Sequence, residues 1–435
     1  MNQQIKQRIE QINNGQVPEG YKKTEFGIFP SDWVTDKKLK DIGSFDKGRG
    51  LLGDKMCDSG VPCVGYGDIY MKYNNFHFEK VENFVDEDTA SESLPIKKGT
   101  LLFTGTGETA KEIGKCVCYN GDETIYAGGD IITFKTNEVN PLFLAYQQYQ
   151  SYSLAKKASF GQGHSVVHIQ KDSLEKLNVA YPESFEEQER IAEILMKWDE
   201  AIVLYDRQIE KLKRLKLVCI KKMFPKKRSK VPEVRFKGFT KDWEQRKLSE
   251  VAEIVGGGTP STNIPEYWDG DIDWYAPAEI NDQIYVDGSE RKITKLGLEK
   301  SSAKILPANK TVLFTSRAGI GKTAILRRSG ATNQGFQSMV LNDETNPYFV
   351  FSMSKFIKEE AERVASGSTF AEVSGKMLGN LAFMFPAKKE QDKIGEFFSN
   401  LDNLITLHQR KVGKIKTQRK ALQQYLLNGI VRVDV

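Results

Sequence analysis

A chain of 435 residues is long enough for two or three domains with cores of their own. Apolar residues make up 39% of the chain, no run of about 18 apolar residues occurs, and the N-terminus lacks the apolar segment of a secretory signal. The composition therefore predicts that the chain has no transmembrane helix and stays in the cytosol. The net charge of +5 permits binding to a polyanion but does not require it.

The chain begins with a polar segment and continues into a glycine-rich region. We expect residues 1–20 to form a helical arm. Residues 21–183 contain short β-type runs, among them "GTLLFTG" and "DIITFK", separated by many glycine turns. This pattern predicts a globular domain of mainly β or mixed structure.

Four of the five cysteines lie in this first domain, but their spacing does not fit a zinc site, which favours C-x₂₋₄-C pairs. We expect reduced, partly buried thiols and no disulfide framework.

A heptad pattern starts where the first domain ends. Over residues 184–224, seam residues follow one another in steps of three and four, which predicts one long helix that packs against a partner helix. Ser184 and Glu187 form a predicted capping box at its start, and Pro225 ends it. The seam positions are Ile191, Leu195, Trp198, Ile202, Tyr205, Ile209, Leu212, Lys216 and Cys219.

The second half of the chain repeats the first in the same order. The stretch "EEQERIAEIL" (186–195) returns as "KEQDKIGEFF" (389–398), and "GTLLFTGT" (99–106) returns as "KTVLFTSR" (310–317). A collinear series of this kind indicates a duplicated unit. The predicted second copy consists of a linker and domain over 225–386, a long helix over 387–428 and a tail over 429–435.

The duplication predicts an α+β fold in which two similar, mainly β or mixed domains are separated by two long helices. Each helix of about 40 residues spans roughly 60 Å. Antiparallel packing buries both apolar seams in a coiled coil and relates the two halves by a pseudo-twofold axis. The second seam consists of Ile394, Phe398, Leu401, Ile405, His408, Val412, Ile415, Arg419 and Leu422.

Two stretches look like cofactor motifs but lack a required residue. "FTSRAGIGKT" (314–323) ends like a phosphate-binding loop, yet Ser316 stands where that motif needs its first glycine. Its counterpart in the first half has Cys116 in place of the final Ser or Thr, so both copies predict strand, loop and strand.

"NPYF" (346–349) is similar to a loop of amino-methyltransferases, but its counterpart "NPLF" (140–143) also precedes an apolar helical stretch. An asparagine N-cap followed by proline explains both copies. No catalytic or metal-binding pattern such as GxSxG or HExxH occurs.

The order of the motifs resembles that of the specificity subunits of type I restriction–modification systems. The resemblance rests on "EQERIAEIL" after the first domain, "VPEVRFKGFTKDWEQRKL" at the start of the second, "EQDKIGEFFSNLD" after it and "ALQQYLLNGIVRV" at the end. "GGGTPST", "SRAGIGKTAI" and "GFQSM" belong to the same pattern. The match covers nearly the whole chain.

The resemblance implies that each domain is a target recognition domain for one half of a split, asymmetric site in double-stranded DNA. The helices would set the spacer and dock two modification (methyltransferase) subunits, which restriction (motor-nuclease) subunits join. This chain would be non-catalytic and hold no cofactor. S-adenosylmethionine would bind to the modification subunits, and ATP with magnesium to the motor subunits.

The loops of the two domains differ more than their frameworks, and they carry side chains that stack on bases or hydrogen-bond to them. The predicted DNA contacts of the first domain are Lys47, Arg49, Tyr66, Tyr70, Thr104, Thr106, Gln162 and His164. Those of the second domain are Thr259, Ser261, Ser316, Arg317, Lys322, Gln334, Gln337 and Ser368. We expect Lys115 and Lys322, which both halves share, to support the framework or contact phosphates.

Two alternatives stay open at this point. One is a coiled-coil, protein-binding scaffold without DNA recognition. The other is the DNA-binding half of a fused restriction enzyme.

Overall fold

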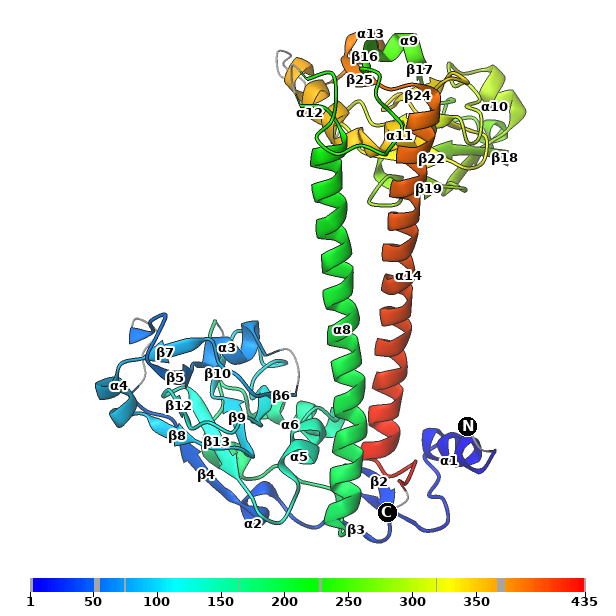
Figure 1. The fold of residues 1–435 in the computed structure, drawn as a ribbon. Coiled ribbons are helices and arrows are strands. Elements are labelled where there is room, and N and C mark those ends of the chain that lie inside the picture. Colours follow the sequence, from blue (N-terminus) through cyan, green and yellow to red (C-terminus); the bar gives the residue numbers. More distant parts are fainter. Residues whose placement is uncertain are drawn as a thin grey trace. The chain divides into compact units, whose positions relative to one another are not determined.

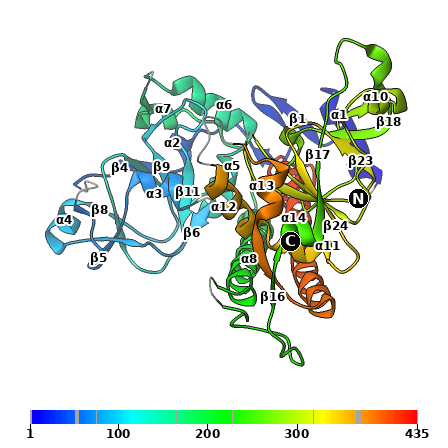
Figure 2. The same ribbon diagram turned by 90° about the horizontal axis from the view of Figure 1, so that it is seen from above.

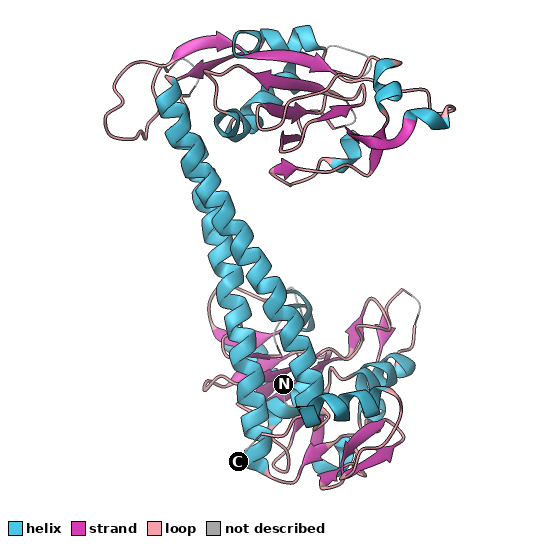
Figure 3. Ribbon diagram, turned by 90° about the vertical axis from the view of Figure 1, so that its right-hand side faces the viewer, coloured by secondary structure: helices cyan, strands magenta, loops and turns pink. Residues whose placement is uncertain are grey.

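The computed structural model describes residues 3–50, 55–73, 76–163, 165–226, 229–317, 319–365 and 372–433. The chain forms two compact units, unit 1 (Met1–Tyr205 with Lys411–Val435) and unit 2 (Asp206–Arg410). Two long helices, α8 (Phe185–Met223) and α14 (Lys388–Leu427), each contribute a segment to both units. Strands gather in the globular part of each unit (Figure 3).

Short strands and helices build the globular part of unit 1. In chain order they are α1 (Gln3–Asn13), β1 (Tyr21–Thr24), β2 (Gly27–Pro30), β3 (Trp33–Val34), α2 (Leu39–Ile42), β4 (Ser44–Lys47), β5 (Val61–Val64), α3 (Tyr66–Met71), β6 (His77–Phe78), β7 (Asn83–Val85), α4 (Glu87–Glu92), β8 (Leu94–Ile96), β9 (Thr100–Thr104), β10 (Thr106–Gly107), β11 (Cys116–Tyr119), β12 (Ile125–Ala127), β13 (Ile131–Lys135), α5 (Pro141–Gln147), α6 (Ser151–Phe160), β14 (Val167–His168), α7 (Lys171–Leu174) and β15 (Tyr181–Pro182). The larger sheet has the order β4-β13-β9-β11-β6, and a four-stranded sheet has the order β7-β5-β12-β8. Within these two sheets, β6 is parallel to β11 and β5 to β12, and the other pairs are antiparallel.

Strand β9 is apolar on both faces because each face meets a separate core. Leu101 and Phe103 belong to the core under α5, which packs against β9 and β11 (Figure 2). Leu102, which points to the opposite face, packs with residues of the smaller sheet such as Val64. Burial on both faces explains the unbroken apolar run in this strand.

Unit 2 repeats this arrangement. Its elements are β16 (Glu244–Lys247), α9 (Leu248–Val251), β17 (Ala252–Gly256), β18 (Trp268–Tyr275), β19 (Tyr285–Val286), β20 (Arg291–Ile293), α10 (Lys295–Glu299), β21 (Thr311–Phe314), β22 (Thr323–Leu326), β23 (Gly330–Thr332), β24 (Gln337–Leu341), α11 (Pro347–Ser352), α12 (Ser354–Ala365), α13 (Gly375–Asn380) and β25 (Ala382–Phe385), with short 3₁₀ turns at Pro265–Tyr267 and Pro277–Glu279. The five-stranded order β17-β24-β21-β22-β19 matches that of unit 1 strand for strand, including the parallel pair at its edge. The larger sheets of the two globular domains therefore share one strand order, as the internal repeat predicts, whereas the second sheet of unit 2 has three strands, β20-β18-β23, against four in unit 1.

The two stretches that look like cofactor motifs have the predicted structures. β21 and β22 are antiparallel neighbours joined by the loop that contains "GIGK", so this segment is strand, loop and strand. Asn140 and Asn346 each accept a hydrogen bond from a backbone N–H three residues later, at 3.0 and 2.9 Å, and a proline follows each of them. Both "NP" pairs therefore begin helices.

Segments of α8 and α14 pack antiparallel within each unit (Figure 1). In unit 1, Asp199 of α8 binds Arg419 of α14, and Tyr205 lies under the ammonium group of Lys411 at 4.6 Å. The number of the α14 partner falls as that of the α8 residue rises, which defines an antiparallel pair. The predicted seam residues of both helices are buried or half-buried, which confirms the heptad pattern.

A tyrosine, an aspartate and a cation meet at one polar position of each helix pair. In unit 1, the guanidinium of Arg419 donates to both carboxylate oxygens of Asp199 at 2.8 and 2.9 Å, and the hydroxyl of Tyr146 donates to the same carboxylate at 2.8 Å. We call these three residues the unit 1 triad. Burial, together with the Asp199 carboxylate, raises the pKa of Tyr146, so its hydroxyl stays a donor.

The unit 2 triad, Tyr348, Asp402 and Lys216, is its counterpart. The Lys216 ammonium lies 2.7 Å from Asp402, and the Tyr348 hydroxyl donates to the same carboxylate at 2.7 Å. Polar residues at seam positions fix the register of helix pairs. The two triads therefore fix equivalent registers in the two halves.

Each long helix begins with an equivalent set of side-chain contacts. The hydroxyl of Ser184 accepts a hydrogen bond from the Glu187 N–H at 3.2 Å, as predicted for the cap. The Glu187 carboxylate, however, accepts hydrogen bonds from the Arg432 guanidinium at 2.6 and 2.7 Å. In a capping box it would instead accept one from the backbone N–H of Ser184. In unit 2, Glu390 accepts from Arg235 at the same two distances.

The observed helix bounds differ from the predicted 184–224 and 387–428 by one residue at each end. Within the part of the chain that is described, no helix combines the length and the apolarity needed to cross a bilayer.

Candidate nucleic-acid interface

One edge of the larger sheet of unit 1 carries the loops for which contacts are predicted. Lys47 at the end of β4 pairs with Ile132, and Thr104 at the end of β9 pairs with Ile131. Strand β11 begins beside them, with Cys116 opposite Phe103. The antiparallel order therefore places the loop after β4, the loop after β9 and the turn before β13 next to one another.

Tyr70 and Thr104 form the root of the loop over residues 105–115. The Thr104 hydroxyl lies 2.7 Å from the Tyr70 hydroxyl and accepts from the Lys115 N–H at 3.0 Å. The Lys115 ammonium donates to the Tyr70 carbonyl at 3.3 Å, and burial lowers its pKa. Thr104 is 0% exposed, so it supports the loop and, contrary to our prediction, presents no surface to a ligand.

Thr106 and Gln162 lie on the small β10–β14 sheet that this loop forms. Thr106 pairs with His168 and lies 3.3 Å from its Nδ1, and Gln162 bridges to the same histidine. The Thr106 hydroxyl also donates to the Asp130 carboxylate at 3.4 Å. Thr106 and Gln162 are therefore joined through His168, and Thr106 also contacts Asp130; neither His168 nor Asp130 is among the predicted contacts.

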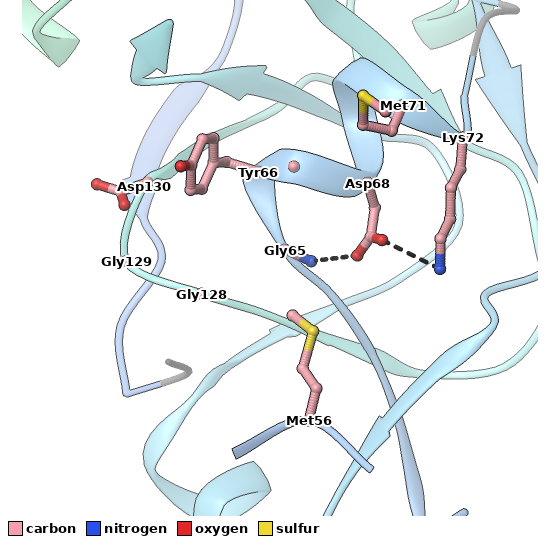
Figure 4. A pocket seen from close by; sticks show the side chains of 10 residues that line it. Met56, Gly65, Tyr66, Asp68, Met71, Lys72, Gly128, Gly129 and Asp130 are labelled. Atoms are coloured by element: carbon pink, nitrogen blue, oxygen red, sulfur yellow. Dashed lines mark hydrogen bonds and ion pairs between the residues drawn. The ribbon is translucent and has the colours of Figure 1, made fainter. Parts of the chain in front are cut away.

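Lys47, Arg49 and Tyr66 are exposed. Tyr66 lies at the start of α3 beside a pocket of about 400 Å³, whose lining also includes Met56, Asp68 and Asp130 (Figure 4). The Asp68 carboxylate accepts from the Gly65 N–H at 2.9 Å and lies 3.3 Å from the Lys72 ammonium. The pocket thus has one neutralised carboxylate within it and exposed groups at its rim.

Unit 2 presents the same sheet edge. Gly256 at the end of β17 pairs with Gln337 at the start of β24, and the Gly258 N–H donates to the Thr332 carbonyl at 2.9 Å. The Thr259 hydroxyl hydrogen-bonds the Gln334 side chain. Three predicted contact residues, Thr259, Gln334 and Gln337, are therefore brought together by the glycine-rich loop and the turn before β24.

Ser316 is a second residue whose burial contradicts its predicted contact. Its side chain is fully buried, its N–H donates to the Gly335 carbonyl at 2.8 Å, and its carbonyl accepts from Val373 at 2.9 Å. In the sequence Ser316 lies just beyond the apolar residues of β21, which predicts a loop residue. The structure shows that it anchors two neighbouring segments through its backbone.

Arg317, Lys322 and Ser261 complete the described set. Arg317 and Lys322 are half-buried, and Ser261 is exposed on the loop after Gly258. The Lys322 N–H donates to the Thr315 hydroxyl at 2.9 Å, as Lys115 does to Thr104 in unit 1. The backbone of each shared lysine is therefore part of the framework, as predicted.

His164 and Ser368 lie outside the described residues, so their predicted contacts stay predictions. Among the residues described, no three His, Cys, Asp or Glu side chains lie close enough together to hold a metal ion. The cysteines are free thiols, and burial raises the pKa of Cys63 to about 11 and that of Cys118 to about 12.

Comparisons with known proteins agree with this geometry. A family model described as "Type I restriction modification DNA specificity domain" matches residues 30–214 and 240–417. A putative type I restriction enzyme MjaX specificity subunit from Methanocaldococcus jannaschii is 26% identical over 95% of this chain and 97% of its own length. The MjaIX specificity subunit of the same organism is 37% identical, over 38% of this chain and 39% of its own length.

The fold is also similar to that of a solved structure. The crystal structure of a type I restriction–modification S subunit from M. genitalium aligns with a TM-score of 0.58 at 14% identity. The alignment covers 93% of this chain and 96% of that chain. At this identity the likeness concerns the fold alone, and it agrees with two α+β domains and two long helices.

Proposed function

We propose that this chain, which belongs to the family of type I restriction–modification DNA specificity domains, is the subunit that selects the DNA sequence in such a complex. One observation carries the proposal. The five-stranded sheets of the two domains have the same strand order and present the same edge, and the loops at that edge differ in length and in side chains. A repeated frame with divergent loops suits the recognition of two different half-sites.

The cations of these edges, exposed in unit 1 and half-buried in unit 2, would contact phosphates, and the polar and aromatic side chains would contact base edges. Lys47, Arg49, Arg317 and Lys322 supply the positive charge in this proposal. The side chains proposed to contact bases are Tyr66, Thr106, Gln162, Thr259, Ser261, Gln334 and Gln337, together with the half-buried Tyr70. Thr104 and Ser316 are buried and support the loops through hydrogen bonds to Lys115 and Gly335.

The long helices supply the proposed surface for modification subunits. Leu204 on α8 is 56% exposed and Leu407 on α14 is 62% exposed. The repeat that aligns Asp199 with Asp402 also aligns these two leucines with each other. Equivalent apolar positions on the two halves suit two copies of one partner, each bound to one helix pair.

Catalysis is proposed to reside in the partners. Methyl transfer from S-adenosylmethionine would take place on the modification subunits, and ATP-dependent cleavage on motor-nuclease subunits that join them. This chain would contribute sequence selection and spacing within a cytoplasmic complex. The length of the paired helices is the proposed determinant of the spacer.

A salt titration of DNA binding tests the proposal. The chain, purified with its modification subunits, should bind its target with an affinity that falls steeply as the salt concentration rises. A plot of the logarithm of the binding constant against the logarithm of the salt concentration should have a negative slope of about 0.9 for each phosphate contacted. Lys47→Ala together with Arg49→Ala should reduce that slope. Lys98→Ala is the control, because Lys98 lies in the same domain and is ion-paired with Asp122.

An affinity that does not change with salt would show that phosphate contacts are absent. The protein-binding scaffold would then be the better account of the chain.

A further inference from the structure

The turn that precedes β13 in unit 1 holds a carboxylate that the frame does not need. The Asp130 carbonyl accepts from the Gly105 N–H at 2.7 Å, and the Gly48 N–H donates to the Ile131 carbonyl at 2.8 Å. A Cβ on Gly48 would overlap the Gly128 carbonyl, so the loop after β4 is held directly against this turn. The backbone on both sides of Asp130 is therefore fixed, whatever its side chain does.

Unit 2 shows that this backbone arrangement forms without the carboxylate. There, the Ser316 N–H donates to the Gly335 carbonyl at 2.8 Å, as Gly105 does to Asp130. The equivalent residue is thus a glycine, and the same sheet edge forms around it. The Asp130 side chain is a feature of one domain rather than of the shared frame.

The Asp130 carboxylate is exposed and almost without partners. Among the described residues, its side chain receives one hydrogen bond, from the Thr106 hydroxyl at 3.4 Å, and makes no ion pair. Asp68, across the same pocket, is buried and neutralised by Lys72 and two further donors. Figure 4 shows Asp130 beside the Tyr66 ring at the rim of that pocket.

A free carboxylate at a DNA-binding edge is unfavourable beside phosphates unless it meets a hydrogen-bond donor. In the major groove the donors are the amino groups of cytosine and adenine. Adenine presents the acceptor N7 next to its amino group, and guanine and thymine present acceptors, all of which repel a carboxylate. Cytosine presents its amino group alone.

Resting on the proposed function, we propose that Asp130 is a specificity-determining residue that accepts a hydrogen bond from the amino group of one cytosine in the half-site bound by the first domain. Tyr66 lies beside the carboxylate at the rim of the pocket, and the Thr106 hydroxyl donates to it at 3.4 Å. The backbone hydrogen bonds of the turn fix the position of the Asp130 main chain before DNA binds.

The test is selection of bound DNA by the complete complex of this chain with its modification subunits. The pool consists of duplexes in which the first half-site is randomised. The native complex should prefer cytosine at one position, and Asp130→Ala should reduce that preference by about tenfold while other positions are unchanged. Asp130→Asn should move the preference toward adenine, because an amide pairs with both the amino group and N7.

Asp122→Asn is the matched control, an exposed carboxylate of the same domain that is ion-paired with Lys98 at 2.9 Å. It should leave every preference unchanged. The inference is overturned if Asp130→Ala leaves the preferences of the first half-site unchanged, or raises binding to all sequences equally. A native complex that selects no sequence would instead refute the proposed function itself, and this inference with it.

Discussion

Removal of Arg419 should destabilise the helix pair of unit 1 far more than removal of Lys216 destabilises that of unit 2. The side chains of Arg419 and Asp199 are 9% and 7% exposed, whereas Lys216 is 25% exposed beside an Asp402 that is 7% exposed. Deleting one partner of a buried ion pair leaves an uncompensated charge and costs about 3–5 kcal/mol. We expect that cost for Arg419→Leu, and about 1–3 kcal/mol for Lys216→Leu, the range for a lost hydrogen bond to a charged group.

Hydrogen exchange is the appropriate assay, because a chain with two units need not unfold in one step. In Arg419→Leu, amides of α14 near position 419 should exchange about 100- to 4,000-fold faster than in the native chain. The double variant Asp199→Leu with Arg419→Leu should recover most of the protection, since replacing both partners of a buried pair with apolar groups is often neutral. Glu200→Gln, at the exposed neighbour of Asp199, is the control.

The reasoning is refuted if Arg419→Leu exchanges within about threefold of the native rate, well below the range expected for a buried pair. It is also refuted if the double variant is no better protected than the single one. Either result would mean that the unit 1 triad does not hold the two helices together.

Leu204→Asp and Leu407→Asp should each lower the number of modification subunits bound per chain from two to one, measured by native mass spectrometry; unchanged stoichiometry in both would exclude these surfaces. Lys157 is buried, donates to the Gly114 carbonyl at 2.9 Å, and has its pKa lowered by burial from 10.5 to about 8. Its charged form therefore opposes folding below pH 8, and this penalty is relieved as the pH rises from about 8 toward 10.5, where the unfolded chain binds the extra proton. The stability of the native chain relative to Lys157→Met, from denaturant midpoints, should thus be higher at pH 9.5 than at pH 7, and a difference independent of pH would contradict the assignment. Deleting seven residues from each long helix, 203–209 and 408–414, should shorten the preferred DNA spacer by about three base pairs and leave both half-sites unchanged; altered half-sites in the methylated DNA would argue against separate recognition and spacing.

Periodicity and internal repetition carry most of what the sequence predicts correctly. The heptad seam identifies both long helices, because each apolar position must face the partner helix, and the cap at Ser184 and the stop at Pro225 locate the ends of the first helix to within one or two residues. Asn140 and Asn346 are recognisable as helix caps because proline follows each of them and an apolar run comes next. The "IGK" of residues 320–322 has a counterpart at residues 113–115, which Cys116 follows in place of Ser or Thr. The two copies together argue against a phosphate-binding loop and its helix more clearly than either copy alone.

The side chains at the sheet edge are harder to predict. Thr104 is the last residue of β9 and Ser316 lies just beyond β21, so both look like loop residues, but other segments pack over them and hydrogen-bond to them. Asp130 was missed because a Gly-Gly-Asp turn has no chemical signature of its own. Its proposed role depends on the equivalence of Asp130 with Gly335, which rests on backbone hydrogen bonds that a sequence does not display.

The threonine clamp at the base of each variable loop affects how such proteins diversify. The hydroxyl of Thr104 accepts from a backbone N–H 11 residues later, and that of Thr315 accepts from one 7 residues later. The same hydrogen bond thus closes loops of unequal length, and the pairing of the two flanking strands stays antiparallel in both units. Under the proposed function, insertions and deletions between these two points would change the side chains offered to DNA and leave the strands that carry the loop unchanged.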